Sequence, residues 1–142
     1  TMYLAFELIE AGKLDPRQVF VMSPAIARDW RRKGSTMFLD AGERVRVDDL
    51  LLGIANVSAN DGAAVLAEGQ AGSVAAWAQA MNQTALSLGM TGSHFGTPNG
   101  WPDEGRTFTT ANDLVTLARA MITRHREKFG YYIGRAGFDY KG

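Results

Sequence analysis

The stretch IANVSANDGAA, residues 54–64, holds a hydroxyl and a carboxamide two positions apart, Ser58 and Asn60. They interrupt two apolar segments, residues 50–54 and 63–67, that have the side-chain spacing of buried helices. Polar side chains at such a junction destabilise a fold unless they find hydrogen-bond partners. Ser58 and Asn60 therefore form a candidate functional site. On these residues alone, the alternative is that Ser58 merely caps a helix beginning near Asn60.

The composition is that of an ordinary globular domain and argues against several classes of protein. The 142 residues carry a formal net charge of +0, so no nucleic acid or other polyanionic partner is indicated. This length favours a single domain over residues 1–142. No apolar run approaches the roughly 20 residues that a membrane-spanning helix needs. The absence of Cys excludes disulfides, thiolate metal sites and a Cys nucleophile.

The apolar periodicity predicts a mainly helical protein with a few short strands. Trp77 and Met81 fall on the apolar face of the most regular helix and should lie in the core. The predicted helices cover residues 1–11, 24–30, 50–54, 61–71, 74–88 and about 111–122, with Ser23, Ser73 and Thr110 as N-caps. Short strands are expected near residues 18–22, 36–39, 44–47 and 136–140, and 36–39 should pair with 44–47.

Two further segments have distinctive compositions. Residues 90–108 are rich in Gly, Pro, Asn and Thr and are too long for a simple connection, which is typical of a functional loop. Residues 31–34, Arg-Arg-Lys-Gly, lack the glycine spacing of a phosphate-binding loop and are interpreted as a solvated basic surface. His94 and His125 have no second ligand at helical spacing. We therefore predict no metal site and expect both histidines at the surface or as caps.

The sequence lacks the common nucleophile motifs of acyl transfer. No serine is followed three residues later by lysine, no serine lies in Gly-x-Ser-x-Gly, and Lys-Thr-Gly is absent. A serine needs a neighbouring base to become nucleophilic. By itself, the chain therefore has an accessory polar pair without a nucleophile.

Both ends of the sequence read as interrupted elements. The chain is already in the apolar spacing of a buried helix at Thr1, and residues 138–140 alternate like a strand that has no returning partner. We therefore expect a truncated part of a larger domain. A first helix that lacks the neighbours it would have in the larger domain should expose apolar surface and favour self-association.

The order of short motifs along nearly the whole chain resembles the D-alanyl-D-alanine carboxypeptidases, the low-molecular-mass penicillin-binding proteins. The motifs are TMFL at residues 36–39, VDDLL at 47–51, SANDGA at 58–63, GS at 72–73, MN at 81–82, LGM at 88–90, HF at 94–95, PNG at 98–100 and TANDL at 110–114. This family uses the motifs Ser-x-x-Lys, Ser-x-Asn and Lys-Thr-Gly. The resemblance places the first motif immediately before Thr1 and the third beyond residue 142.

The resemblance implies a fold and roles for five residues. The fold would be mainly α with short β-strands, the helical lobe of the β-lactamase and transpeptidase-like α+β fold. Ser58 would relay a proton to the leaving D-alanine amine, and Asn60 would hydrogen-bond a substrate carbonyl. Asn99 and Trp101, in the Pro-Asn-Gly-Trp segment, would border the cleft, as would Ser35 on another loop.

The resemblance also implies a substrate, a location and rival functions. The whole protein would be an exported, periplasmic or cell-envelope serine carboxypeptidase that acts on peptidoglycan pentapeptides ending in D-Ala-D-Ala, binds β-lactams and needs no cofactor or metal. A D,D-endopeptidase or a β-lactamase is the rival within the superfamily. Ala59 in the middle of Ser-x-Asn argues against the β-lactamase, although Glu104 could supply its loop glutamate. A non-catalytic helical module that binds a wall peptide or a protein is the rival from another class.

Overall fold

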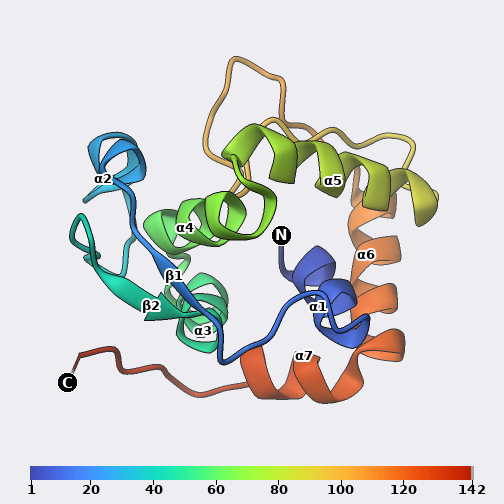
Figure 1. Cartoon of the computed structure of the whole chain (residues 1–142). Coiled ribbons are helices and arrows are strands. Elements are labelled where there is room, and N and C mark those ends of the chain that lie inside the picture. Colours follow the sequence, from blue (N-terminus) through green and yellow to red (C-terminus); the bar gives the residue numbers. More distant parts are fainter. Residues whose placement is uncertain (142) are drawn as a thin grey trace.

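The computed structural model describes residues 1–141 and is built mainly from helices, with one pair of short strands (Figure 1). The elements in chain order are α1 (Met2–Glu10), β1 (Val19–Val21), α2 (Pro24–Trp30), β2 (Arg44–Arg46), α3 (Val47–Val57), α4 (Asn60–Ala71), α5 (Val74–Ser87), α6 (Ala111–Arg124) and α7 (Arg126–Tyr132). The predicted helical character is confirmed. Among the residues described, no helix is both long and apolar enough to cross a membrane.

Helix α4 occupies the centre of the molecule because its small side chains let other elements approach closely. Ala63, Ala64 and Ala67 are buried, and α4 contacts α2, α3, α5 and β1. At Gly69 a Cβ atom would overlap the ring of Phe20 on β1, so glycine permits this contact. Figure 1 shows α4 with α2 and the strand pair on one side and α5 on the other. The first residue of this central helix is Asn60.

The local signals at the helix ends behave as the sequence predicts. The side-chain oxygens of Ser23, Ser73 and Thr110 each accept a hydrogen bond from the backbone N–H three residues later in the chain, at 3.1, 3.0 and 3.1 Å. These bonds satisfy N–H groups that a helix itself leaves without a partner. Trp77 and Met81 are buried in the core, as expected. The prediction of caps and core positions is therefore confirmed at these five residues.

The predicted strands are only partly correct. Strand β1 pairs with β2 in an antiparallel register that sets Phe20 opposite Val45. Residues 36–39 form no strand and do not pair with residues 44–47, and residues 136–140 also form no strand. The first error has a clear cause, because the N–H groups of Met37 and Leu39 donate to the carboxylate of Asp61 instead of to a strand. A side chain has replaced the expected backbone partner.

The expected exposure of the first helix is also incorrect. Tyr3, Leu4 and Phe6 of α1 are buried against the rest of the molecule. The exposed large apolar side chains lie elsewhere, above all on α6 and on the loop that precedes it. The buried side chains of α1 are therefore not available for self-association. Self-association through another surface stays a prediction.

Candidate active site

A cavity of about 180 Å³ lies at the junction of α3 and α4. It brings together four of the five residues that the sequence analysis singled out, from three separate segments of the chain. Its lining residues are Ser35, Ile54, Ser58, Ala59, Asn60, Ala63 and Asn99. Polar groups converge here on a partly apolar wall formed by Ile54 and the two alanines. This combination is typical of a site that positions a ligand.

Ser58 is the residue at which the chain turns from α3 into α4. Its backbone is left-handed, with φ 53° and ψ 43°, and it is the C-cap of α3. The alternative that Ser58 caps the following helix is wrong, because Ala59 is the N-cap of α4 and no side chain caps that helix. A left-handed backbone costs a non-glycine residue about 1–2 kcal/mol. The exposed Ser58 hydroxyl makes no hydrogen bond within residues 1–141, so it is free to meet a ligand.

Asn60 is fixed by three hydrogen bonds to two neighbouring loops. Its Nδ2 donates to the carbonyl of Lys33 at 3.0 Å, its Oδ1 accepts from Asn99 Nδ2 at 2.9 Å, and its backbone N–H donates to the carbonyl of Ser35 at 2.9 Å. A carboxamide has two N–H donors and an oxygen with two lone pairs. One N–H and one lone pair therefore remain for a ligand, in an orientation that the protein has already set.

Trp101 does not line the cavity. Its backbone N–H donates to Asn99 Oδ1 at 3.1 Å, which ties it to the residue that holds Asn60. Its ring meets the ring of Trp30 edge-on, with centroids 6.1 Å apart and planes at 89°. The structure thus joins Ser35, Ser58, Asn60 and Asn99 directly and adds Trp101 as a neighbour.

Gly34 is a contributor that the sequence analysis missed. A Cβ atom at this position would lie 2.8 Å from Asn60 Nδ2 and 2.9 Å from the ring of Trp101. Its φ of +67° also lies in the left-handed region that favours glycine. Because Gly34 has no side chain, its backbone can pack closely against the side chains of both Asn60 and Trp101. The only signal in the sequence was a glycine after three basic residues, which does not reveal what it touches.

Asp61 is a second contributor that the sequence analysis missed. Its carboxylate is fully buried and accepts hydrogen bonds from the N–H groups of Met37, Leu39 and Gly62 at 2.9, 3.1 and 2.8 Å. Phe38, between the first two donors, has φ 57°, and this conformation turns both N–H groups toward one anion. The position of Asp61 in the first turn of α4 also suits the helix dipole. Asp61 therefore fastens the 35–39 segment beside Asn60.

The loop over residues 90–108 is held by polar contacts at both ends. The side chain of Asn82 exchanges two hydrogen bonds with the backbone of Phe95, at 2.7 and 2.9 Å. Asp103 accepts from the backbone and the hydroxyl of Thr107, each at 2.7 Å. Desolvation acts to raise the pKa of Asp103, but the bonds from Thr107 outweigh it and hold the pKa below its usual value. The loop is thereby ordered enough to present Asn99.

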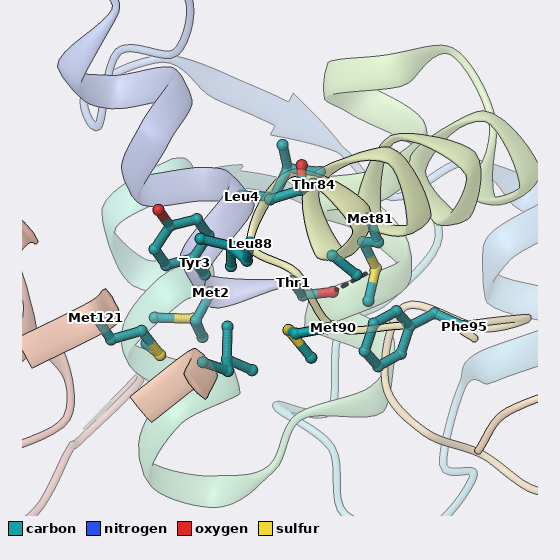
Figure 2. A pocket seen from close by; sticks show the side chains of 12 residues that line it. Thr1, Met2, Tyr3, Leu4, Met81, Thr84, Leu88, Met90, Phe95 and Met121 are labelled. Carbon is teal, nitrogen blue, oxygen red and sulfur yellow. Dashed lines mark hydrogen bonds between the residues drawn. The ribbon is translucent and has the colours of Figure 1, made fainter. Parts of the chain in front are cut away.

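A separate cavity of about 110 Å³ lies between α1, α5 and α6 and has a different character (Figure 2). Figure 2 shows Met2, Met81, Met90 and Met121 gathered around it. Its polar side chains are already engaged: Thr84 donates to a carbonyl of its own helix, and the hydroxyl of Thr1 is bonded to Trp77 and Met81. The hydroxyl of Tyr3, which also lines this cavity, accepts a hydrogen bond from Arg124 at 3.1 Å and is likewise engaged.

The two histidines do not form part of a site. His94 lies at the surface and pairs with Phe108 across the loop, as expected of a surface residue. His125 is buried, with 4% of its surface exposed and its ring edge-on to those of Tyr3 and Phe6, but it occupies the cap position between α6 and α7, so the expectation of a cap is confirmed and that of a surface residue is wrong. No group of three or more potential metal ligands occurs among residues 1–141.

Comparison with known proteins assigns the family. Residues 1–137 match the family described as D-alanyl-D-alanine carboxypeptidase, peptidase family S11. The chain belongs to this family. The carboxypeptidase DacF of Bacillus subtilis is 32% identical over 122 residues, which cover 86% of this chain and 30% of that protein. The carboxypeptidase DacC of Escherichia coli is 31% identical over 135 residues, which cover 93% of this chain and 34% of that protein.

Solved structures show the same fold. The D-alanyl-D-alanine carboxypeptidase DacD of Francisella tularensis superposes with a TM-score of 0.85 at 37% identity, over 92% of this chain and 31% of that one. Penicillin-binding protein 6B of Escherichia coli gives a TM-score of 0.90 at 29% identity, over 99% of this chain and 45% of that one. The chain therefore has the fold of the helical lobe of these proteins. It spans about a third of the length of the curated family members that it matches.

Proposed function

We propose that this chain is part of a serine-type D-Ala-D-Ala carboxypeptidase, which removes the terminal D-alanine of a peptide through an acyl-enzyme. The observation that carries the proposal is the shared cavity of Ser58 and Asn60, with Asn60 held by Lys33 and Asn99. A rigid carboxamide with one free N–H can bind a carbonyl without reorganising, which is how such groups contribute to acyl transfer. Membership of the carboxypeptidase family supports the same reaction.

Each residue of the cavity has a role in this proposal. The free N–H of Asn60 binds a peptide carbonyl of the substrate. The hydroxyl of Ser58 passes a proton to the D-alanine amine as the amide bond breaks. Asn99 and Ser35 border the peptide, and Asn99 also keeps the Asn60 oxygen engaged. Trp101 helps to hold Asn99 in position, because its backbone N–H donates to the Asn99 side chain.

The reaction needs groups that these residues do not supply. The 142 residues contain neither Ser-x-x-Lys nor Lys-Thr-Gly. The proposal therefore concerns the parent protein, by which we mean a protein that contains this chain together with both motifs. Its substrate would be a peptidoglycan pentapeptide ending in D-Ala-D-Ala, β-lactams would acylate the same serine, and its location would be the periplasm or the cell envelope. This chain alone would be inactive.

One rival function loses its support in the structure. Glu104 left the β-lactamase alternative open as a possible loop glutamate, but Glu104 is exposed on the 90–108 loop and is not among the residues that line the cavity. A carboxylate must come within hydrogen-bond reach of a water beside the acyl group to drive deacylation. The roles that we propose for Ser58 and Asn60 in a carboxypeptidase use side chains that line the cavity.

Labelling with a fluorescent penicillin tests the proposal. We expect stoichiometric covalent labelling of the parent protein, release of free D-alanine from a peptide ending in D-Ala-D-Ala, and no covalent labelling of the 142-residue chain, because a nucleophile is missing from it. Labelling of the short chain would contradict our assignment of the nucleophile. An unlabelled parent protein that releases no D-alanine would favour the non-catalytic binding module. Cleavage of internal cross-links without D-alanine release would favour the endopeptidase.

A further inference from the structure

The ammonium group of Lys33 sits in a corner formed by two indole rings next to the candidate site. Its Nζ lies 4.6 Å from the ring centroid of Trp30 and 4.9 Å from that of Trp101, and the two rings are perpendicular. A cation over an aromatic face is attracted by about 0.5–1 kcal/mol at a site open to water. The flexible lysine side chain is thereby held in one place.

This cation has no acidic partner within residues 1–141. Of the neighbouring basic residues, Arg31 pairs with Asp40, while Lys33 takes part in none of the ion pairs of the chain. A fixed charge without a counter-charge, on the loop that also holds Asn60, favours the binding of an anionic group. The basic segment 31–34, which the sequence suggested was only a solvated surface, therefore has one member with a defined environment.

Lys33 is also joined directly to the group that would bind the substrate. Its carbonyl accepts one N–H of the Asn60 carboxamide, at 3.0 Å, and the other N–H of the same Nδ2 is the proposed donor to a peptide carbonyl. A peptide bound by that donor must pass beside the 33–35 segment. Gly34 permits this close arrangement because it has no side chain. The ammonium group is thus placed where it can meet a side chain of the bound peptide.

We propose that Lys33, held by Trp30 and Trp101, is a specificity residue that recognises a carboxylate on the peptide before the D-alanyl pair. The inference rests on the proposed function and narrows its substrates to acidic acyl donors. The interaction is a partly exposed ion pair, so it contributes modestly and weakens with salt. The uncharged stem of Lys33 and the indole rings remain as packing surface when no carboxylate is present.

The test compares two acetylated tripeptides, Glu-D-Ala-D-Ala and Gln-D-Ala-D-Ala, which differ only in one charge. We expect the parent protein to prefer the acidic peptide in kcat/KM by about fivefold, as one partly exposed ion pair supplies. Lys33→Met should reduce this ratio to about one, and Lys33→Arg should retain it. Raising the salt from about 0.1 M to about 0.5 M should reduce the ratio in the unchanged protein and in Lys33→Arg, but not in Lys33→Met, where no charge preference remains.

Arg32→Met is the matched control, because Arg32 is an exposed cation on the same loop that contacts neither indole ring. It should leave both rates and their ratio unchanged. The inference is overturned if the unchanged protein shows no preference or if Lys33→Met keeps the preference. It is also overturned if Lys33→Met lowers the rates for both peptides equally, because that result would indicate a purely structural contact. Cleavage of both peptides at equal rates defeats this inference alone. Cleavage of neither defeats the proposed function and this inference with it.

Discussion

The two cavities of this protein differ in what their walls offer, and the difference decides what each can do. The cavity at the α3–α4 junction has carboxamides and hydroxyls from three segments on its walls, and one N–H of Asn60 and the hydroxyl of Ser58 have no partner in the part of the chain that the structure describes. The cavity beside α1 is walled by methionines and aliphatic side chains, and its threonines are already hydrogen-bonded (Figure 2). Free polar groups at fixed positions, and not volume, mark a site for chemistry.

The apolar cavity has its own physical explanation. Methionine is unbranched and adaptable, so it fills irregular gaps where helices meet at uneven distances. The walls come from α1, α5 and α6, and Met81 of α5 faces the hydroxyl of Thr1 at 3.4 Å. This cavity serves the packing of the three helices. Substitutions in the apolar cavity should therefore affect stability, and substitutions in the polar cavity should affect catalysis.

The largest contrast is expected at Asn60. In the parent protein, Asn60→Ala should lower the second-order rate of penicillin acylation by about 10²–10³-fold, or roughly 3–4 kcal/mol, because a preorganised donor is lost. Asn56→Ala is the matched control, since its carboxamide donates only to the carbonyls of Leu52 and Tyr132. The control should lose about 1 kcal/mol of stability and keep its acylation rate. An Asn60→Ala protein that acylates within about threefold of the original rate would show that Asn60 is structural.

The apolar cavity should give the opposite pattern. Met81→Ala should lower the free energy of unfolding by about 3 kcal/mol, because a buried side chain is replaced by empty space. Acylation by the folded fraction should change little. The measurement is a denaturant titration, with Leu86→Ala on the same helix as control, where the side chain is 64% exposed. The control should shift stability by less than about 0.5 kcal/mol. Equal effects at both positions would argue against a packed α5.

Ser58 should separate stability from activity within one substitution. Ser58→Gly should gain about 1 kcal/mol of stability, since glycine adopts the left-handed backbone at φ 53° without strain. The same change should lower turnover of a D-Ala-D-Ala peptide by about 10²-fold, because the proton relay is lost. Val57→Gly, one residue earlier and helical, should instead lower stability by about 0.5 kcal/mol. Full activity in Ser58→Gly would remove the hydroxyl from the mechanism.

The smallest effect is expected at the loop that carries Asn99. The pKa of Asp103 is lowered in the folded protein, so its contribution to stability is present above the unfolded pKa, about 4, and is lost as pH falls through the folded value. Amide NMR signals of Thr107 and Asn99 should therefore begin to move together only below about pH 4. In Asp103→Asn this shared movement should vanish. Movement of Asn99 alone would indicate that the loop is not one unit.

Features that depend on contacts within a few residues could be predicted without the three-dimensional structure. The N-caps at Ser23, Ser73 and Thr110 bond to amides three positions away, so each signal and its partner lie in one short stretch. Apolar spacing likewise identified the buried face of α5. The Ser-x-Asn pair was found for the same reason, and the order of motifs along the chain led from it to the family.

The tertiary structure alone decided the arrangements that join distant segments. Residues 36–39 look like a strand locally, yet Asp61 binds the N–H of Met37 across 24 positions and the expected pairing does not form. Asn99 reaches Asn60 across 39 positions, and the indole of Trp101 meets Lys33 only because both loops fold over α4. Such contacts depend on chain geometry summed over many residues, which side-chain periodicity does not encode. The candidate residues could thus be read from the sequence, but the cavity that unites them could not.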